Sequence, residues 1–563
     1  MSISTSEPKR PRIAILSGPM GTIENTAPLV TGNKARLRYG LAAQPGRRFE
    51  ALRPQRLAAP VTVYVEQFSA HPLERDAAAL YAPPDGFVDR RGRFRAERRS
   101  PADIPVYAME LHPDDGLYPL PYAGRQADGN AWDDVCTRPG APVEGCRQTF
   151  YPDASRLVEE IDRLGLGPDG QVGALSARAE FSFHRVAPSG GYRAGLAATS
   201  RTDAGKGDIS SEELGRDYFP YLPPHLLREP SSAILAGLTD RAAAALDEPG
   251  LAGAVILDAS TGLEETAYWL SLLLDTPLPV VATCSPDAPH GVVGAIGDRN
   301  LMDAVEYITA GAWADDQGRD RVGVVVVSAG LLIAARDAHK TDARPGGIVG
   351  LGGSGVIGNL ARPGRPHLTY IPARRATHRS EVRLTCIPST VSGVAWAAGG
   401  ARTLQAVSVE VRDPAGRLLP GAMPQVAIVS HGRFRTADDA GVAAQVAAFL
   451  ATAPLAGFVA AGSTPYGRLD PPVDAALTQA AFSGQVVARV GHGDSEGFVT
   501  PDTVRNAIAG GDLSPTKARL LLMACLLRFG APPPAADPPH PTPDERQAVT
   551  AHLAQFQEVF DQH

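Results

Sequence analysis

The sequence lacks the features that mark several large classes of protein. Only 5 of its 563 residues are cysteine, and their spacing fits neither a disulfide framework nor a metal cluster. No run of about 18 apolar residues is present that would span a membrane. The apolar run near the amino terminus is too short for the core of a signal peptide. We therefore expect a cytoplasmic protein that neither spans nor binds a membrane.

Charge of one sign is not concentrated anywhere in the chain. The formal net charge is -7, and no long run of lysine or arginine occurs. This pattern gives no electrostatic footprint for nucleic acid or for an anionic membrane surface. A composition that is 44% hydrophobic and 20% charged is ordinary for a globular chain with a substantial core. The expected partner is therefore a small molecule.

Two blocks of the chain alternate between apolar strands and helices. The first begins near residue 230 and reads AILAGLTDRAAAAL, AGAVIL, LEETAYWLSLLL, PLPVVATC, NLMDAVEYITAGA and RVGVVVVS. The second begins at MPQVAIVS and ends with SPTKARLLLMACLL. Continuous apolar strands separated by helices predict parallel sheets covered on both faces. The fold class is therefore α/β, with parallel sheets.

The remaining segments have a different character. Residues 41–229 are rich in proline, glycine, arginine and aspartate with few periodic stretches, which predicts an irregular, loop-rich insertion. Residues 531–563 begin with a proline-rich stretch (APPPAADPPHPTPDE) followed by a short polar helix, which predicts a tail that lies over the surface or is partly disordered.

Four collinear segments carry the chemistry. They are GPMGTI at 18–23, DASTGLEET at 258–266, ARDAHKT at 335–341 and GDLSPTKAR at 511–519. They resemble TGGTI, HGTDTLEET, ARDVTKT and GDLSPQKAR of the bacterial-type L-asparaginase and glutaminase family. Between them, GDRNLMDA at 297–304 resembles DGPxNLxDA. The sequence is therefore similar to that family over residues 10–40 and 230–530, with a large insertion.

The resemblance implies a fold and an organisation. We expect a larger N-terminal α/β domain over residues 10–400, interrupted at about 41–229, and a smaller C-terminal α/β domain over 401–530. A tail over 531–563 follows. The insertion begins where the family has its catalytic lid, so we expect it to reshape the mouth of the site. The alternative is a peripheral decoration that mediates oligomer contacts.

The resemblance also places the catalytic groups. Thr22 stands at the position of the nucleophile, on a glycine-bounded turn where backbone N–H groups can hold a developing oxyanion. Lys340 stands at the catalytic lysine, and Ser260 would pair with it, because a lysine desolvated beside a hydroxyl can act as a base. Tyr39 is the candidate for the family's tyrosine on the mobile segment. Neither a metal nor an organic cofactor is implied.

The departures from the family bear on the substrate. The Asp of HGTDT, which supports the lysine and binds the substrate ammonium, is Thr261 here, and the His is Asp258. Pro465 stands where the family lends an Asn to the neighbouring subunit. Ser231 and Ser232 fit the position of the serine that binds the substrate carboxylate. We therefore expect Ser231, Ser232, Thr261 and Asp258 to bind an amide other than L-asparagine.

The sequence leaves several alternatives open. Ser260 could be the nucleophile in place of Thr22. The chain could be a true L-asparaginase or glutaminase with a rearranged site, or a descendant that binds a ligand without catalysis. The loop at residues 462–467 predicts a homodimer or homotetramer, because in the family it faces a neighbour's site.

Overall fold

The computed structural model describes the α/β part of the chain and pieces of the segment before it. The described residues are 10–17, 30–31, 50–51, 54–56, 61–65, 86–88, 94–111, 117–119, 147–148, 175, 178–185, 232–258, 262–284, 296–341, 348–350, 355–360, 366–374, 384–397, 403–430, 439–463, 466–492 and 498–563.

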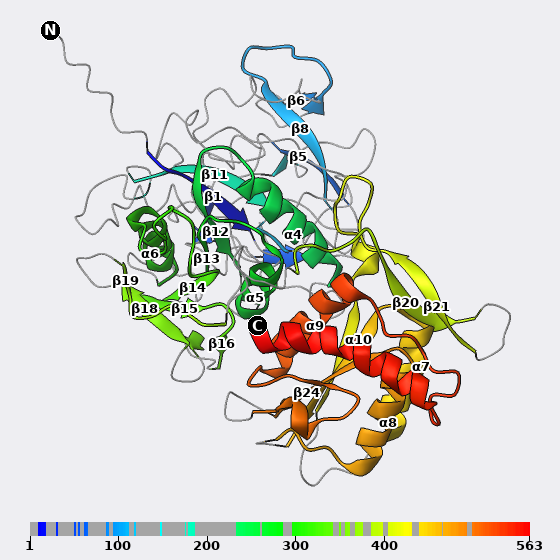
Figure 1. The fold of residues 1–563 in the computed structure, drawn as a ribbon. Helices are drawn as coiled ribbons and strands as arrows, with labels where there is room; N and C mark the ends of the chain where they lie inside the picture. Colours follow the sequence, from blue (N-terminus) through cyan, green and yellow to red (C-terminus); the bar gives the residue numbers. More distant parts are fainter. Residues whose placement is uncertain are drawn as a thin grey trace.

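The largest sheet has eight strands in the order β11-β1-β12-β13-β14-β15-β18-β19 (Figure 1). Its first five strands are parallel, and β15, β18 and β19 continue it in antiparallel pairing. In chain order the strands are β1 (Arg12–Ser17), β11 (Glu180–Arg185), β12 (Leu251–Leu257), β13 (Val280–Thr283), β14 (Val325–Ser328), β15 (Leu331–Ala334), β18 (Val356–Leu360) and β19 (Pro366–Leu368).

Three helices connect and cover these parallel strands: α4 (Ala233–Leu246), α5 (Leu263–Leu273) and α6 (Ile296–Ala310). Alternate residues of each strand enter opposite cores, so Ile256 packs with α4 and α5 while Val255 packs with α6. Both faces of the sheet are thus buried. The α/β fold class with parallel sheets, predicted from the sequence, is confirmed.

A second, four-stranded parallel sheet has the order β22-β23-β24-β25. Its strands are β22 (Gln425–Ser430), β23 (Ala456–Gly462), β24 (Val486–Gly491) and β25 (Ile508–Ala509), and its helices are α7 (Asp439–Thr452), α8 (Pro471–Phe482) and α9 (Pro515–Phe529). A two-stranded ribbon of β20 (Thr390–Trp396) and β21 (Leu404–Glu410) precedes it. Helix α9 is buried along most of its length, because it packs both on this sheet and on α5.

The carboxyl-terminal segment differs from the short surface helix expected. Helix α10 (Pro543–Gln562) has 20 residues and begins with a capping box in which Thr542 and Glu545 cap each other. Five of its apolar side chains are buried, including Phe556 at 0% exposure. Apolar residues spaced for one helix face, in a sequence that is otherwise polar, let α10 pack on α9 and β25.

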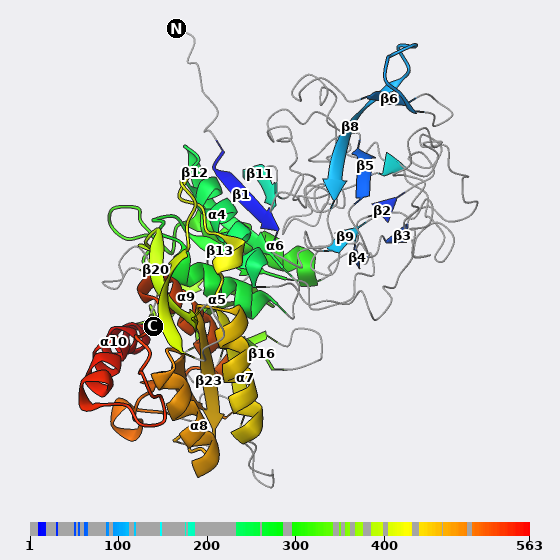
Figure 2. The same ribbon diagram turned by 90° about the vertical axis from the view of Figure 1, so that its right-hand side faces the viewer.

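The segment expected to be irregular contains regular structure in its described residues. A mostly antiparallel five-stranded sheet, β10-β5-β8-β6-β7, comprises β5 (Val61–Val65), β6 (Gly86–Val88), β7 (Phe94–Arg95), β8 (Ile104–Leu111) and β10 (Arg147–Gln148). Short pairs join β2 (Val30–Thr31) to β3 (Glu50–Ala51) and β4 (Pro54–Arg56) to β9 (Leu117–Pro119). These strands lie at the opposite end of the molecule from α8 and α10 (Figure 2). Strand β11 from the same segment joins the large sheet beside β1.

No helix in the described ranges is long and apolar enough to cross a membrane.

Candidate active site

The candidate site lies at the carboxyl edge of the large parallel sheet. Leu257, Thr283 and Val327 are paired in register on β12, β13 and β14. The residues that follow them, Asp258, Cys284 and Ser328, therefore form the next row across the three strands. All three side chains are buried. The edge where strands of an open α/β sheet end is where such folds bind ligands.

Asp258 is a buried acid in this row. Its side chain is 1% exposed, and its Oδ2 accepts a hydrogen bond from the hydroxyl of Thr266 on α5. Burial raises the pKa of the neighbouring Cys284 thiol to about 12; the charge of Asp258 adds to this effect and the charge of Lys340 opposes it. Asp258 and Lys340 thus both act electrostatically on the same thiol, and this thiol is not a nucleophile at neutral pH.

Lys340 ends a short ribbon that packs against the start of α5. Strand β16 (Ala338–Lys340) pairs with β17 (Ile348–Gly350), and Ala338 and Ile348 anchor the ribbon in the core. The main-chain N–H of Lys340 donates to Oε2 of Glu264 at 2.7 Å. The ring of His339 contacts the same oxygen through Nδ1. The main chain at Lys340 is thus fixed to the helix that follows Asp258.

Glu264 is ionised in this setting despite its burial. The residue is 9% exposed, and burial alone acts to raise the pKa of its carboxyl. The contact with His339, the charge of Lys517 and the Lys340 N–H outweigh burial, and the pKa lies below its usual value. Its place in the first turn of α5 favours the anion further, because the helix dipole is positive there.

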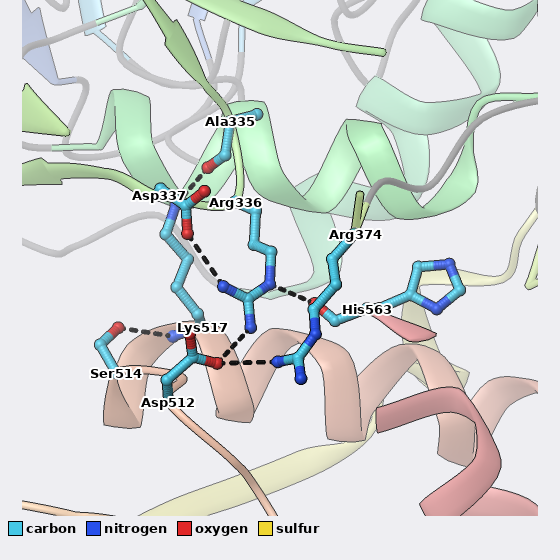
Figure 3. A network of polar contacts seen from close by, with 8 residues as sticks. All are labelled: Ala335, Arg336, Asp337, Arg374, Asp512, Ser514, Lys517 and His563. Atoms are coloured by element: carbon cyan, nitrogen blue, oxygen red, sulfur yellow. Dashed lines mark hydrogen bonds and ion pairs between the residues drawn. The ribbon is translucent and has the colours of Figure 1, made fainter. Parts of the chain in front are cut away.

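Lys517 connects helix α9, which covers the second sheet, to the main chain at Glu264 and Ala335. Its Nζ donates to the main-chain carbonyl oxygens of Glu264 at 2.6 Å and of Ala335 at 2.9 Å, and it lies 5.0 Å from the ring centre of Tyr268. The residue is 2% exposed, and burial lowers the pKa of its ammonium to about 8. Ser514 caps α9 by accepting the N–H of Lys517, which fixes the lysine in the first helical turn (Figure 3).

A charged network beside Lys517 ties the same elements together (Figure 3). Arg336 donates to Asp337 at 2.9 Å, to Asp512 at 2.6 Å and to the carbonyl oxygen of His563 at 2.5 Å. Asp512 also accepts from Arg374 at 3.0 Å, and these arginines keep the pKa of its carboxyl below the usual value despite its burial. Arg336 lies two residues before the start of β16, so the network holds the base of the ribbon that carries Lys340.

Three of the predicted site residues are described. Asp258 and Lys340 lie around Cys284, as above, and Ser232 is the N-cap residue of α4 with no side-chain cap hydrogen bond. Helix α4 runs back toward the start of β12, so Ser232 lies at the same edge of the sheet as Asp258. The other predicted site residues lie outside the described residues: Thr22, Tyr39, Ser231, Ser260 and Thr261.

Two functional candidates were missed in the sequence. In the sequence Glu264 is one of two acids in DASTGLEET and Lys517 is one cation in GDLSPTKAR, with no local signal that sets either apart. Both stand in family-like segments. Their contacts join residues more than 70 and 180 positions apart, Glu264 to Lys340 and Lys517 to Ala335, and local pattern does not reveal such pairs.

Two sequence comparisons with known proteins point to one family, and one solved structure is reported beside them. Residues 229–348 match the family model described as "Asparaginase, N-terminal". The chain is 28% identical over 306 residues to a glutaminase-asparaginase of Pseudomonas fluorescens biotype A, covering 52% of this chain and 69% of that protein. The structure of a probable cytoplasmic L-asparaginase from Campylobacter jejuni aligns with a TM-score of 0.42 at 20% identity, covering 59% of this chain and 86% of that one.

Proposed function

The chain belongs to the asparaginase family, and on that premise we propose that it is an amidohydrolase that cleaves a linear or cyclic carboxamide other than L-asparagine. The observation that carries the proposal is the fixed position of Lys340. Its main chain is bonded to the helix that follows Asp258, at the carboxyl edge of the sheet. A lysine held at this edge is available as a base beside a hydroxyl nucleophile.

The proposed reaction has two halves. The hydroxyl oxygen of Thr22 attacks the carboxamide carbon while its proton passes toward Lys340, directly or through Ser260. The C–N bond breaks, the nitrogen leaves as ammonia or an amine after taking a proton, and an acyl ester remains on Thr22. Water then attacks the ester, and the acid and free Thr22 are released. Tyr39 is the further candidate for a group that assists the hydroxyl.

The proposed substrate preference follows from charge. With Thr261 in place of the family's Asp and Pro465 in place of its Asn, the ammonium of a free amino acid loses two partners. A buried ammonium without partners costs several kcal/mol, enough to lower turnover by orders of magnitude. Ser231 and Ser232 would still bind an acidic or polar end of the substrate. An ammonia-release screen over amino-acid amides, dicarboxylic monoamides, lactams and cyclic imides tests this, and L-asparagine as the best substrate would contradict it.

The identity of the nucleophile is tested by substitution and by mass spectrometry. Thr22→Ala is expected to lower kcat by roughly three orders of magnitude with folding intact, and Lys340→Met comparably. Mass spectrometry of a quenched reaction with a slow substrate should find the acyl group on the peptide that contains residue 22. An adduct on the peptide with residue 260, or near wild-type rates in Thr22→Ala, would assign the nucleophile to Ser260 and leave the amidohydrolase proposal standing.

A further inference from the structure

We propose that Glu264 is a positioning residue for the catalytic base: its carboxylate fixes the main chain of Lys340, and through it the direction of the lysine side chain. The inference rests on the proposed function, in which Lys340 is the base. It concerns how this chain holds that base.

The ribbon that carries Lys340 is small, and two of its side chains, Ala338 and Ile348, pack in the core. Among the described strands, β16 pairs only with the three-residue strand β17. A two-stranded ribbon is marginal without further packing. A direct hydrogen bond between the ribbon and the large domain runs from the Lys340 N–H to Glu264 Oε2, at 2.7 Å, and the His339 ring contacts the same oxygen. One carboxylate oxygen therefore holds two successive residues of the ribbon.

This contact determines where the lysine side chain is directed. Successive side chains of a strand extend to opposite faces. Since the ring of His339 is directed at Glu264 on α5, the side chain of Lys340 is directed to the other face. There its charge acts on Cys284, the neighbour of Asp258 at the sheet edge. Loss of the Glu264 anchor would free the ribbon to rotate, and with it the lysine.

The main chain at Glu264 is itself held by Lys517. Lys517 of α9 binds the Glu264 and Ala335 carbonyl oxygens, so it joins the start of α5 to the turn before β16. Lys517 and His339 act on the charge of the Glu264 carboxylate, and Lys517 is in turn acted on by Arg336 and Asp337 from that turn and by Glu265, which pairs with Arg519. His339 stands where the family segment ARDVTKT has Thr, so the Glu264–His339 contact is a departure of this chain from that segment.

The test compares Glu264→Gln, Glu264→Ala and the control Glu265→Ala, which removes the ion pair with Arg519 in the same helical turn. Glu264→Ala is expected to lower kcat by about 100-fold, the cost of a misplacement near 1 Å, with KM changed by less than about threefold. In Glu264→Ala, the pH at which kcat falls on the acid side should also shift, because this fall reports protonation of the base. Glu264→Gln keeps an oxygen for the Lys340 N–H and should recover most of kcat, while Glu265→Ala should match the wild type.

Rates are taken per folded molecule, with the folded fraction measured by circular dichroism on the same samples. Hydrogen exchange of the peptide that contains residues 338–341 should be faster in Glu264→Ala than in Glu264→Gln. The inference is overturned if Glu264→Ala keeps wild-type kcat and pH profile, or if Glu264→Gln is as impaired as Glu264→Ala. A wild-type protein that hydrolyses no amide of the screen overturns the proposed function, and the assignment of Lys340 with it.

Discussion

Replacing Lys517 by methionine should change how the stability of the protein depends on pH. The ammonium of Lys517 is fully buried between α5, α9 and the turn before β16, where burial lowers its pKa from 10.5 to about 8. At about 1.4 kcal/mol for each pKa unit, this difference corresponds to roughly 3 kcal/mol of unfavourable free energy for the charged form in the folded protein.

The sign of the pH dependence follows from proton binding. Between pH 8 and 10.5 the unfolded chain still holds the lysine proton, whereas the folded chain has released it. The free energy of unfolding therefore rises with pH across this window through Lys517, by at most about 1.4 kcal/mol per pH unit. This contribution is lost as the pH falls through about 8. Methionine has a similar length and no proton to release, so Lys517→Met removes this rise.

Stability at a single pH is less informative than the slope. Lys517→Met removes the cost of the buried charge, but it also leaves the carbonyl oxygens of Glu264 and Ala335 without the donor at 2.6 and 2.9 Å. Each lost bond from a charged donor costs about 1.5–3 kcal/mol, so the two effects oppose each other near neutral pH.

The assay is urea unfolding at several pH values between about 7 and 10, the window in which the lysine titrates. Fluorescence of Trp269, which is 0% exposed on α5, reports the same core. Arg519→Met is the matched control, because arginine on the same helix does not titrate in this range. If the wild type and Lys517→Met have the same slope of unfolding free energy against pH, the reasoning from burial is refuted.

Three further predictions follow from other parts of the fold. Burial raises the pKa of the Asp240 carboxyl from 3.8 to about 6, so the charged form destabilises the fold progressively as the pH rises from 3.8 through 6. Asp240→Asn keeps an acceptor for the Leu418 N–H and should raise the free energy of unfolding by about 1 kcal/mol at pH 7, after discount for partial exposure. Urea unfolding measures this, and the substitution should have no effect near pH 3. Phe556→Ala should destabilise by about 3–5 kcal/mol and speed hydrogen exchange along α10; unchanged exchange would show that the helix does not depend on this contact. Light scattering should find a homodimer or homotetramer at assay concentration, and an active monomer would contradict that expectation.

The parallel core was predictable because its signals are local. Strands such as AGAVIL and helices such as LEETAYWLSLLL repeat the periodicity of elements buried on both faces, and β12 and α5 form at those residues. The family-like segments also marked Asp258 and Lys340, which the structure brings to the same thiol at the sheet edge. The roles of Thr22, Tyr39, Ser231, Ser260 and Thr261 stay predictions, as do the domain boundaries and the cellular location.

Tertiary structure alone decided which polar groups support Lys340. In the sequence, Glu264 is one of two equivalent acids at a helix start, and Lys517 is one cation in an amphipathic segment. Packing separates them: Glu264 is turned into the core toward His339 and the Lys340 N–H, whereas Glu265 pairs with Arg519 nearer the surface. The docking of α10 was likewise hidden, since its sequence does not say that α9 and β25 are the elements that cover its apolar face. Periodicity specifies which face of an element is apolar, but the partner of a buried charge depends on elements that meet from distant parts of the chain.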